Sequence, residues 1–517
     1  MRLSSVAALA LCLTAATPVW AQQKADDPDP AKIHATEEAK AVAAGWASAP
    51  VDETLTSYDG KATVDGRVIG YTATAGTLTI RDEHGKPQAS LFYTAYTSPG
   101  KHRPVTFFYN GGPGSATLWL RMGSFAPETV LTTDPVAVRP APFDIGPNPD
   151  TLIGSTDMVF IDAVGAGYSR PLGSFKTSDF YGVDADVNAF TKAIKRYVTK
   201  NKRWGDPKYI FGESYGTTRS GALALSLENA GVSVNGVVLL SSILNYGVRQ
   251  SGYDTLYIGY LPTYAATAWY HGRVTDKPAD VADFVEQARV FANGEYASAL
   301  AKGQDISAEE EDRVAQKLSR FTGLSVDYLK RTNLRIDPSR FRKELLRDER
   351  ETVGRFDGRY IGVDDDAAGE RPGYDASDTG ITGVYVSGFM DRLTRKFGYK
   401  TDLDYRLSAY EGGSFAWDFS HRDPDGRKQP IADVTADLSE AMRINPHLRV
   451  LSLNGYYDMA TPFFSTERDL KHMMLPANLR GNLMFHYYPA GHMVYLNPEG
   501  RHAMRVDLER FYAQGAR

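Results

Sequence analysis

The chain has 517 residues, of which 42% are hydrophobic and 23% charged, and its formal net charge is −5. This small negative charge argues against a nucleic-acid-binding protein, which usually carries a clustered excess of Lys and Arg. The 30 Tyr and 23 Phe exclude a disordered chain, because disordered chains are poor in aromatic residues. A chain of this length can bury a large core without disulfides or metal ions.

The N-terminal residues predict a secretory signal peptide at 1–21. Arg2 precedes an apolar run at residues 6–16, and Val19 and Ala21 fit the −3 and −1 positions of a cleavage site. The alternatives are a buried helix or an uncleaved anchor, but the run is too short to span a bilayer comfortably. We therefore expect cleavage after Ala21, no membrane anchor, and a loose, polar leader at 22–50.

The single cysteine, Cys12, lies within this predicted signal peptide, so the mature chain would have no cysteine. An exported protein that cannot form a disulfide is more typical of the bacterial periplasm than of eukaryotic secretion. We therefore expect a secreted, periplasmic protein.

After the leader, strands are predicted to alternate with helices. Residues 62–97 alternate polar with apolar, and Asp65-Gly66 and Ala75-Gly76 are typical of hairpin corners. Helices are predicted over residues 184–198 and from Ser214 to about Gly231. Short apolar runs typical of buried strands occur at residues 105–109, 158–162, 209–211, 237–240, 450–453 and 483–488. The alternation predicts an α/β fold with a mostly parallel sheet that is covered on both faces.

The alternation is interrupted for about 200 residues, which is far too long for a structureless loop in a compact domain. We interpret residues 246–447 as a large, partly helical cap, inserted between a first core part at 51–245 and a second at 448–517.

Within the predicted cap, the first half is expected to be helical. Residues 282–291 have helical periodicity, Ser307 and Glu310 form a capping box, and residues 338–347 are charged and amphipathic. Residues 351–379 are rich in Gly and Asp, and we expect them to form irregular but ordered loops.

A candidate nucleophile lies in Gly212-Glu213-Ser214-Tyr215-Gly216, between a predicted strand and a predicted helix. G-x-S-x-G in this position is the nucleophile elbow, a sharp turn that holds the serine in strained geometry. The serine then lies at the N-terminus of a helix, where amides and the helix dipole stabilise developing negative charge. The alternative is an ordinary glycine-rich turn, because the five-residue pattern alone is a weak signal.

A serine hydroxyl needs an adjacent base, and a third group must orient that base. In α/β-hydrolases the acid and the histidine follow the serine in the chain. Asp458 and His492 each follow one of the last two predicted strands, at the sheet edge where the elbow also lies. Asp162 also ends a strand and is the main rival acid, but it precedes Ser214. His486 lies within its strand and is expected to be structural.

The loop Asn110-Gly111-Gly112-Pro113-Gly114 follows the predicted strand at 105–109. Consecutive glycines allow backbone amides to point into a site, so we expect this loop to complete an oxyanion hole with the amide of Tyr215. The alternative is a tight turn that needs positive φ. No HExxH motif or Cys/His cluster indicates a metal, and we expect no cofactor.

Together these motifs resemble the serine carboxypeptidases, peptidase family S10. The matching segments, in the family's order, are NGGPGS at 110–115, VFIDAVGAGYSR at 159–170, FGESYG at 211–216, NGYYDMATP at 454–462 and PAGHMVY at 489–495. The resemblance implies an α/β-hydrolase fold with a helical insertion after the sixth core strand. It also implies removal of C-terminal residues from peptides through an acyl-enzyme.

The resemblance further implies a role for each matching position. Ser214 would be the nucleophile, His492 the general base and then the acid, and Asp458 the residue that orients His492. The amides of Gly112 and Tyr215 would form the oxyanion hole.

In this family the positions of Asn110 and Glu213 bind the terminal carboxylate of the substrate. Two carboxylates in contact persist only by sharing a proton, which accounts for the acidic optimum usual in the family. The sequence departs from the family at Ser124, where a second acid is expected. Glu128 lies just beyond and is the candidate substitute.

The leading hypothesis is therefore a periplasmic serine carboxypeptidase whose partners are peptides. An esterase or acyltransferase on the same scaffold is the alternative within enzymes. A non-catalytic hydrolase-fold binding protein is the alternative from another class, and the complete Ser/Asp/His set argues against it.

Overall fold

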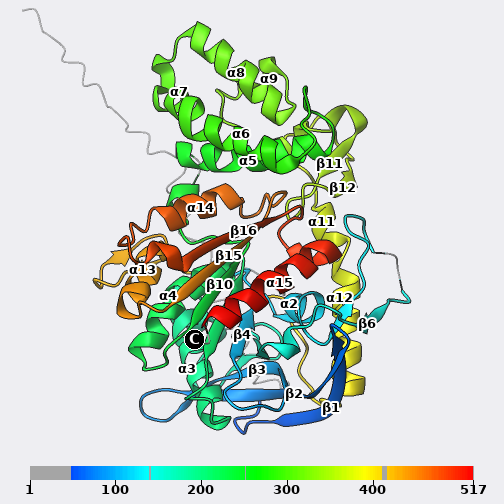
Figure 1. Cartoon of the computed structure of the whole chain (residues 1–517), viewed down its shortest axis with the longest axis vertical. Coiled ribbons are helices and arrows are strands. Elements are labelled where there is room, and N and C mark those ends of the chain that lie inside the picture. The colour runs from blue at the N-terminus through cyan, green and yellow to red at the C-terminus, as the bar shows by residue number, and fades with distance from the viewer. Residues whose placement is uncertain (1–47, 139–140, 251, 410–415, 516–517) are drawn as a thin grey trace, which may run out of the picture.

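The structure of the protein is a computed structural model that describes residues 48–138, 141–250, 252–409 and 416–515 (Figure 1). The predicted signal peptide at 1–21 and residues 22–47 of the predicted leader lie outside the described residues. Across the described part of the chain, no helix combines the length and the hydropathy needed to cross a membrane.

A sheet of ten strands forms the centre of the described structure (Figure 1). Its strands are β1 (Leu55–Val64), β2 (Arg67–Arg81), β3 (Pro87–Thr97), β4 (Val105–Tyr109), β7 (Asp157–Ile161), β8 (Arg170–Pro171), β9 (Lys208–Glu213), β10 (Gly236–Leu240), β15 (Arg449–Gly455) and β16 (Leu483–Tyr488). The order is β1-β2-β3-β7-β4-β9-β10-β15-β16, with β8 paired to β3. The pairings from β7 to β16 are parallel, and those of β1, β2 and β3 are antiparallel.

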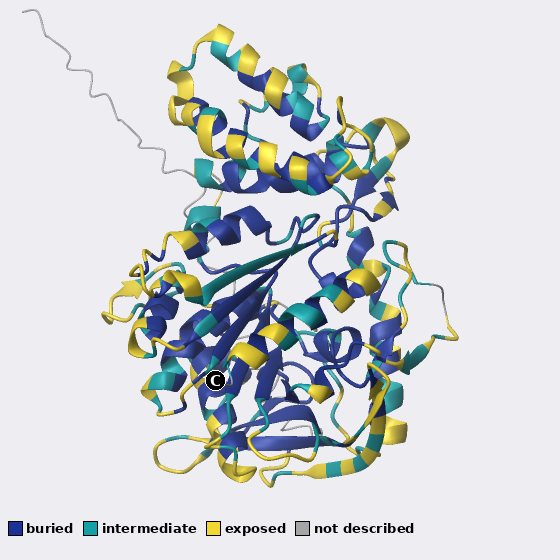
Figure 2. Cartoon of the chain, viewed as in Figure 1, coloured by how far each residue is buried: buried dark blue, intermediate teal, exposed yellow. Residues whose placement is uncertain are grey.

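The predicted α/β-hydrolase fold is confirmed by this strand order, in which β4 and β7 exchange places beside an antiparallel edge. The six predicted buried strands are all present within one or two residues of their expected bounds. β4, β7, β9, β10 and β15 are buried on both faces, which explains why their sequences are continuously apolar rather than alternating, and the edge strand β16 is half-buried (Figure 2).

Helices cover both faces of the sheet. One face carries α3 (Val183–Lys200), α4 (Tyr215–Asn229) and α13 (Thr435–Ile444), and the other carries α2 (Leu118–Gly123), α12 (Thr382–Asp391) and α15 (Pro498–Gly515). Successive side chains of a strand enter the two cores alternately: Phe107 and Tyr109 pack with α3 and α4, and Phe108 packs on the opposite side. The predicted helices at 184–198 and after Ser214 are therefore confirmed.

One of the two predicted hairpin corners is confirmed and the other is wrong. Asp65 and Gly66 have φ of 47° and 76° and join β1 to β2, as an Asp-Gly hairpin requires. Ala75-Gly76 instead lies inside β2 and pairs with both neighbouring strands. A Cβ on Gly76 would lie 2.7 Å from the carbonyl oxygen of Thr54, so this glycine permits a close backbone approach rather than a turn.

Six helices between β10 and β15 share one apolar core. They are α5 (Asp254–Tyr270), α6 (Val281–Phe291), α7 (Ala297–Ala301), α8 (Ala308–Thr322), α9 (Val326–Arg331) and α10 (Pro338–Glu344). The core also contains Tyr457 and Met459 after β15, and α5 packs on α14 (Phe463–Lys471) (Figure 1). One half of the predicted capping box is confirmed: the side chain of Ser307 caps α8 by accepting a hydrogen bond from the amide of Glu310, whose own side chain pairs with Lys302.

The remaining elements of residues 246–447 pack elsewhere. α12 contacts α2, and α13 contacts α4, so both join the cores of the main sheet. The limits of the predicted cap and of the two core parts stay predictions.

The described residues also form several short elements. They are α11 (Ala376–Thr379) and three two-stranded ribbons: β5 (Glu128–Val130) with β6 (Ile145–Pro147), β11 (Glu351–Val353) with β12 (Ile361–Val363), and β13 (His421–Arg422) with β14 (Lys428–Gln429). Residues 351–379, expected to be irregular loops, thus contain one ribbon and one short helix.

A buried ion pair lies beneath the N-terminus of α4. Arg219 binds Asp186 through Nε to Oδ2 at 2.7 Å and through Nη2 to Oδ1 at 3.2 Å, and the Arg219 side chain is 0% exposed. Its Nη1 donates to the carbonyl oxygen of Asn110, and the Tyr215 hydroxyl donates to Asp186 at 3.3 Å. The pair thus joins α3, α4 and the loop after β4.

Substituting Asp186→Ala is expected to destabilise the fold by about 3–5 kcal/mol, because it leaves the Arg219 charge buried without its partner. Chemical unfolding followed by circular dichroism measures this loss. Glu440→Ala is the matched control: Glu440 pairs with Arg443 on the surface, and its loss should cost less than about 1 kcal/mol. Equal losses in the two variants would show that the buried pair contributes no more than a surface pair.

Candidate active site

Ser214 lies at the turn between β9 and α4 and has φ of 59° and ψ of −130°. A positive φ is strained for a residue with a Cβ, and it is the backbone that the elbow motif predicts. The amide of Ser214 donates to the carbonyl oxygen of Leu240, and its carbonyl oxygen accepts from the amide of Thr217. A Cβ on Gly212 would lie 2.2 Å from the carbonyl oxygen of Gly216, so only glycine fits here.

His492 and Asp458 lie together at the ends of neighbouring strands, as predicted from their positions in the chain. Nδ1 of His492 lies 2.8 Å from Oδ2 of Asp458, and both side chains are buried. Because a carboxylate only accepts hydrogen bonds, Nδ1 carries the proton, and Nε2 is left as the basic nitrogen. Burial alone lowers the pKa of His492, but the charge and hydrogen bond of Asp458 outweigh it and raise that pKa above its ordinary value.

Asp458 is itself held by three further donors. Its Oδ1 accepts from the amides of Ala460 and Thr461 at 2.8 and 2.9 Å, and its Oδ2 accepts from the Thr461 hydroxyl at 2.8 Å. These bonds fix the orientation of the carboxylate toward His492. Sequence reasoning missed Thr461, although its place three residues after Asp458 is typical of a residue that closes an Asx turn.

The strand ends bring the elbow and the histidine loop together. Ser241 follows β10, and its hydroxyl donates to the carbonyl oxygen of His492 at 2.5 Å, while Leu240 accepts from the amide of Ser214. Among the described residues, no hydrogen bond joins the Ser214 hydroxyl to His492. Such bonds are often long without substrate and tighten when it binds.

The glycine loop after β4 lies against the elbow. A Cβ on Gly111 would lie 2.5 Å from the amide nitrogen of Tyr215, and Gly112 has φ of 107°. Within the described ranges, neither the amide of Gly112 nor that of Tyr215 donates to a protein acceptor. The amide of Tyr215, directly after Ser214, is therefore unpaired within these ranges and lies against the glycine loop. That it forms an oxyanion hole with the amide of Gly112 stays a prediction.

Glu213 and Asn110, the predicted carboxylate-binding residues, also lie together. Nδ2 of Asn110 donates to Oε2 of Glu213 at 2.8 Å, and the Tyr495 hydroxyl donates to the same oxygen at 3.0 Å. Glu213 is 2% exposed, and burial raises its pKa to about 7 despite the opposing effects of His492, Tyr495 and Asn110. Tyr495 was missed from the sequence, where its only signal is its place three residues after His492.

The other residues considered for acidic roles form contacts of their own. Ser124 donates its hydroxyl to the carbonyl oxygen of Leu120. Glu128 forms ion pairs with Arg392 and Lys396, and the hypothesis that it replaces the missing acid stays a prediction. The rival acid Asp162 binds the amide of Thr117 and the hydroxyl of Tyr405 and not His492, and burial raises its pKa to about 6. His486 pairs with Asp507, consistent with a structural role.

A segment of the insertion supports the histidine loop. The carbonyl oxygen of Phe356 accepts from the amide of His492 at 2.6 Å, and the two rings lie 5.1 Å apart. A Cβ on Gly491 would lie 2.4 Å from the Cβ of Asp357, so this glycine permits the contact. The amide of Met459 donates to the carbonyl oxygen of Arg355. No motif marked this segment in the sequence.

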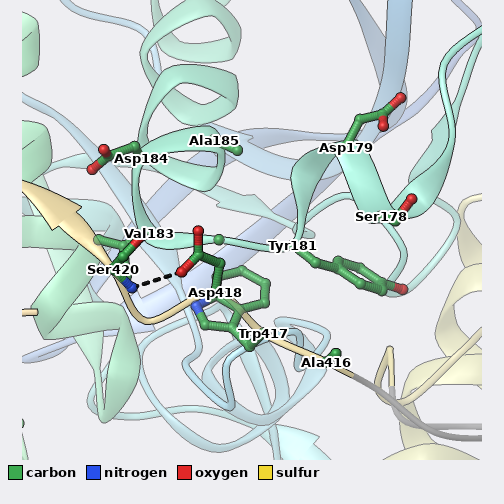
Figure 3. A pocket seen from close by; sticks show the side chains of 11 residues that line it. Ser178, Asp179, Tyr181, Val183, Asp184, Ala185, Ala416, Trp417, Asp418 and Ser420 are labelled. Carbon is green, nitrogen blue, oxygen red and sulfur yellow. Dashed lines mark hydrogen bonds between the residues drawn. The ribbon is translucent and has the colours of Figure 1, made fainter. Parts of the chain in front are cut away.

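A hollow of about 500 Å³ lies at the N-terminal end of α3 (Figure 3). Tyr181, Trp417, Asp418 and Ser420 contribute to its lining, and the Trp417 ring packs 5.3 Å from the ring of Tyr215. The described lining contains none of the candidate catalytic or carboxylate-binding residues. In the part of the chain that is described, no group of three or more His, Cys, Asp or Glu side chains could hold a metal ion.

Comparison with protein families matches the serine carboxypeptidase family, peptidase family S10, at residues 66–349. The match includes Ser214, Asn110 and the insertion as far as α10, and it ends before Asp458 and His492. Comparison with curated protein sequences finds no match.

Solved structures resemble the chain at low identity. Proline iminopeptidase of Mycobacterium smegmatis is 13% identical, with 85% of this chain and 98% of that chain covered and a TM-score of 0.36. A thermostable carboxyl esterase from Bacillus coagulans is 10% identical, with 84% and 96% covered and a TM-score of 0.32. The Cif epoxide hydrolase from Acinetobacter nosocomialis is 13% identical, with 94% and 97% covered and a TM-score of 0.32. These similarities are distant, and the fold assignment rests on the strand order.

The raised pKa of Glu213 predicts a specific pH dependence of stability. Between pH 4.5 and about 7 the folded protein holds a proton that the unfolded chain has released, so the stability contributed by this group is lost as pH rises through that window. Glu213→Gln cannot ionise and lacks this loss. As pH rises from about 5 to about 8, the free energy of unfolding of the variant should therefore increase relative to that of the wild type by about 3 kcal/mol, and its melting temperature should rise relative to the wild type accordingly.

Differential scanning calorimetry of both proteins across this pH range measures the gain. Glu440→Gln, a change of the same kind at a surface carboxylate, is the control and should run parallel to the wild type. A constant difference between Glu213→Gln and the wild type would mean that Glu213 titrates like an exposed carboxyl group.

Proposed function

The chain belongs to the serine carboxypeptidase family, peptidase family S10, and on this premise we propose that it releases C-terminal residues from peptides through an acyl-enzyme intermediate. Family membership and fold make the protein a serine hydrolase. The observation that carries the proposal is the buried Asp458–His492 hydrogen bond at the edge of the sheet where the strained Ser214 turn lies.

In the proposed reaction, Ser214 Oγ attacks the last peptide carbonyl while Nε2 of His492 takes the serine proton. Asp458 holds the imidazole in the required tautomer and stabilises its positive charge. The oxyanion of the tetrahedral intermediate accepts hydrogen bonds from the unpaired amides of Gly112 and Tyr215. His492 then returns the proton to the leaving amine, and water hydrolyses the acyl-enzyme by the same sequence of proton transfers.

Glu213 and Asn110 supply the proposed recognition of a terminal carboxylate. A carboxyl group whose pKa is about 7 is protonated in mildly acidic solution, and it can then donate a hydrogen bond to a substrate carboxylate. Once ionised, Glu213 would repel that carboxylate. The preference for a free terminal carboxylate should therefore be greatest below about pH 7.

The esterase or acyltransferase alternative is favoured by one observation. Ser124 occupies the position of the family's second acid, and Glu128 is engaged in ion pairs with Arg392 and Lys396, so the carboxyl pair of the family is incomplete at that position. A binding protein without activity is disfavoured, because binding does not require the buried Asp458–His492 pair. The signal peptide and the periplasmic location stay proposals from residues 1–21.

A fluorophosphonate probe is expected to label the wild-type protein and not Ser214→Ala. The same substitution should lower kcat for any hydrolysed substrate by at least about a thousandfold, because the nucleophile is lost. Ser298→Ala, at an exposed serine of α7, is the control and should label like the wild type. Equal labelling of Ser214→Ala and the wild type would refute Ser214 as the nucleophile.

Carboxypeptidase specificity is tested with blocked peptides that end either in a free acid or in the amide. We expect a higher kcat/KM for the free acid, and we expect the ratio of the two values to fall as pH rises through about 7, because Glu213 ionises. Mass spectrometry of the products gives the site of cleavage. Equal rates on the acid and the amide at every pH would favour the esterase alternative.

A further inference from the structure

Arg355 is an exposed residue in the insertion segment that supports His492. Its backbone is fixed on both sides: its amide donates to Oδ1 of Asp375 at 2.9 Å, and its carbonyl oxygen accepts from the amide of Met459 at 3.1 Å. The side chain therefore starts from a fixed position beside the loops that carry Asp458 and His492.

Phe356 links this guanidinium group to the imidazole. The Arg355 guanidinium carbon lies 5.1 Å from the centre of the Phe356 ring, and that ring lies 5.1 Å from the ring of His492. The cation is therefore within about 10 Å of the imidazole. An extended residue spans roughly 3.5 Å, so a carboxylate one residue beyond the scissile carbonyl lies within reach of a side chain as long as Arg.

The charge of Arg355 acts on the nearby carboxyl group of Asp378, but no carboxylate of the described residues binds the guanidinium group directly. Among the described residues its side chain has neither a hydrogen bond nor an ion pair, although its neighbours do. Arg359 binds Asp357 and Asp134, and Arg342 lies 3.8 Å from Asp375. Oδ1 of Asp375 accepts instead from the amides of Arg355 and Ser377 and from the Ser377 hydroxyl.

The predicted carboxylate-binding residues, Glu213 and Asn110, bring no positive charge themselves. Glu213, which accepts hydrogen bonds from Asn110 and Tyr495, is either a neutral acid or a negatively charged carboxylate. Ser124 has a hydroxyl group where a second acid is expected, so it cannot share a proton with Glu213. Guanidinium groups are well suited to carboxylates, because they offer paired donors in one plane.

We propose that Arg355 binds a carboxylate of the substrate on the His492 side of the active site. This inference rests on the proposed function and deepens it, because it assigns recognition of the leaving residue to a cation from the insertion. The carboxylate has two possible sources, the C-terminus of the peptide or an acidic side chain of its last residue. Both are recognised by the same chemistry.

The test compares the wild type with Arg355→Gln and Arg355→Lys on matched substrates. One pair is a blocked peptide as its free acid and as its amide, and the other is a peptide amide ending in Glu or in Gln. For Arg355→Gln we expect kcat/KM on the carboxylate-bearing member to fall about 10- to 100-fold, mainly through KM, as expected for a lost charge-assisted hydrogen bond. Values for the neutral member should stay within about twofold of the wild type, because Arg355 makes no contact that the neutral substrate needs.

The pair that responds identifies the source of the carboxylate, and a response in either pair supports the proposal. Arg355→Lys should retain part of the effect, since it keeps the charge and loses the planar donors. Arg427→Gln, at a 78% exposed side chain of the β13–β14 ribbon, is the control and should match the wild type on every substrate. Equal losses of Arg355→Gln on charged and neutral substrates, or no loss on any, would overturn the proposal.

A third pair separates this inference from the proposed function. It is an ester whose alcohol carries a free carboxylate, together with the same ester with that group amidated. If the wild type hydrolyses the esters and no peptide, the carboxypeptidase proposal fails, while the ester pair still reports on Arg355. Loss of the preference for the charged ester in Arg355→Gln would then support the carboxylate site, and an unchanged preference would overturn it.

Discussion

The strained turn at Ser214 depends on the buried ion pair of Arg219 and Asp186. A positive φ at a residue with a Cβ persists only where the surroundings hold it. Here α4 begins at the turn, and Arg219 on its second turn ties that helix to α3 and to the carbonyl oxygen of Asn110. The same contacts therefore fix the serine, the amide of Tyr215 and the glycine loop relative to one another.

Around this turn, the two acids lie in different surroundings. Asp458 accepts three hydrogen bonds from its own loop besides that of His492, and these hold its carboxylate toward the imidazole. Among the described residues Glu213 has only the donors Asn110 and Tyr495 for a fully buried carboxyl group, so burial dominates and its pKa rises to about 7. Two acids close in space thus receive opposite tasks: one orients a base, and the other can carry a proton.

The insertion contributes to the site as well as to the size of the molecule. Its helices α5 to α10 pack on the loop that carries Asp458, and residues 355–358 form hydrogen bonds with the loops of Asp458 and His492. A shift in the backbone of this segment would therefore act on the base directly. The same segment carries Arg355, which Phe356 links to His492. The orientation of the His492 imidazole and the proposed binding of a substrate carboxylate would therefore both depend on the backbone of residues 355–358.

The sequence by itself determined the strand alternation, the elbow and the chain order of Ser214, Asp458 and His492, because hydrophobic periodicity and turn chemistry are local properties. Only the tertiary structure decided which distant groups meet: Tyr495 on Glu213, and Phe356 on His492. It also decided that Gly76 lies inside a strand and that Glu128 pairs with Arg392 and Lys396. These contacts join residues far apart in the chain or depend on close packing, so no local pattern records them.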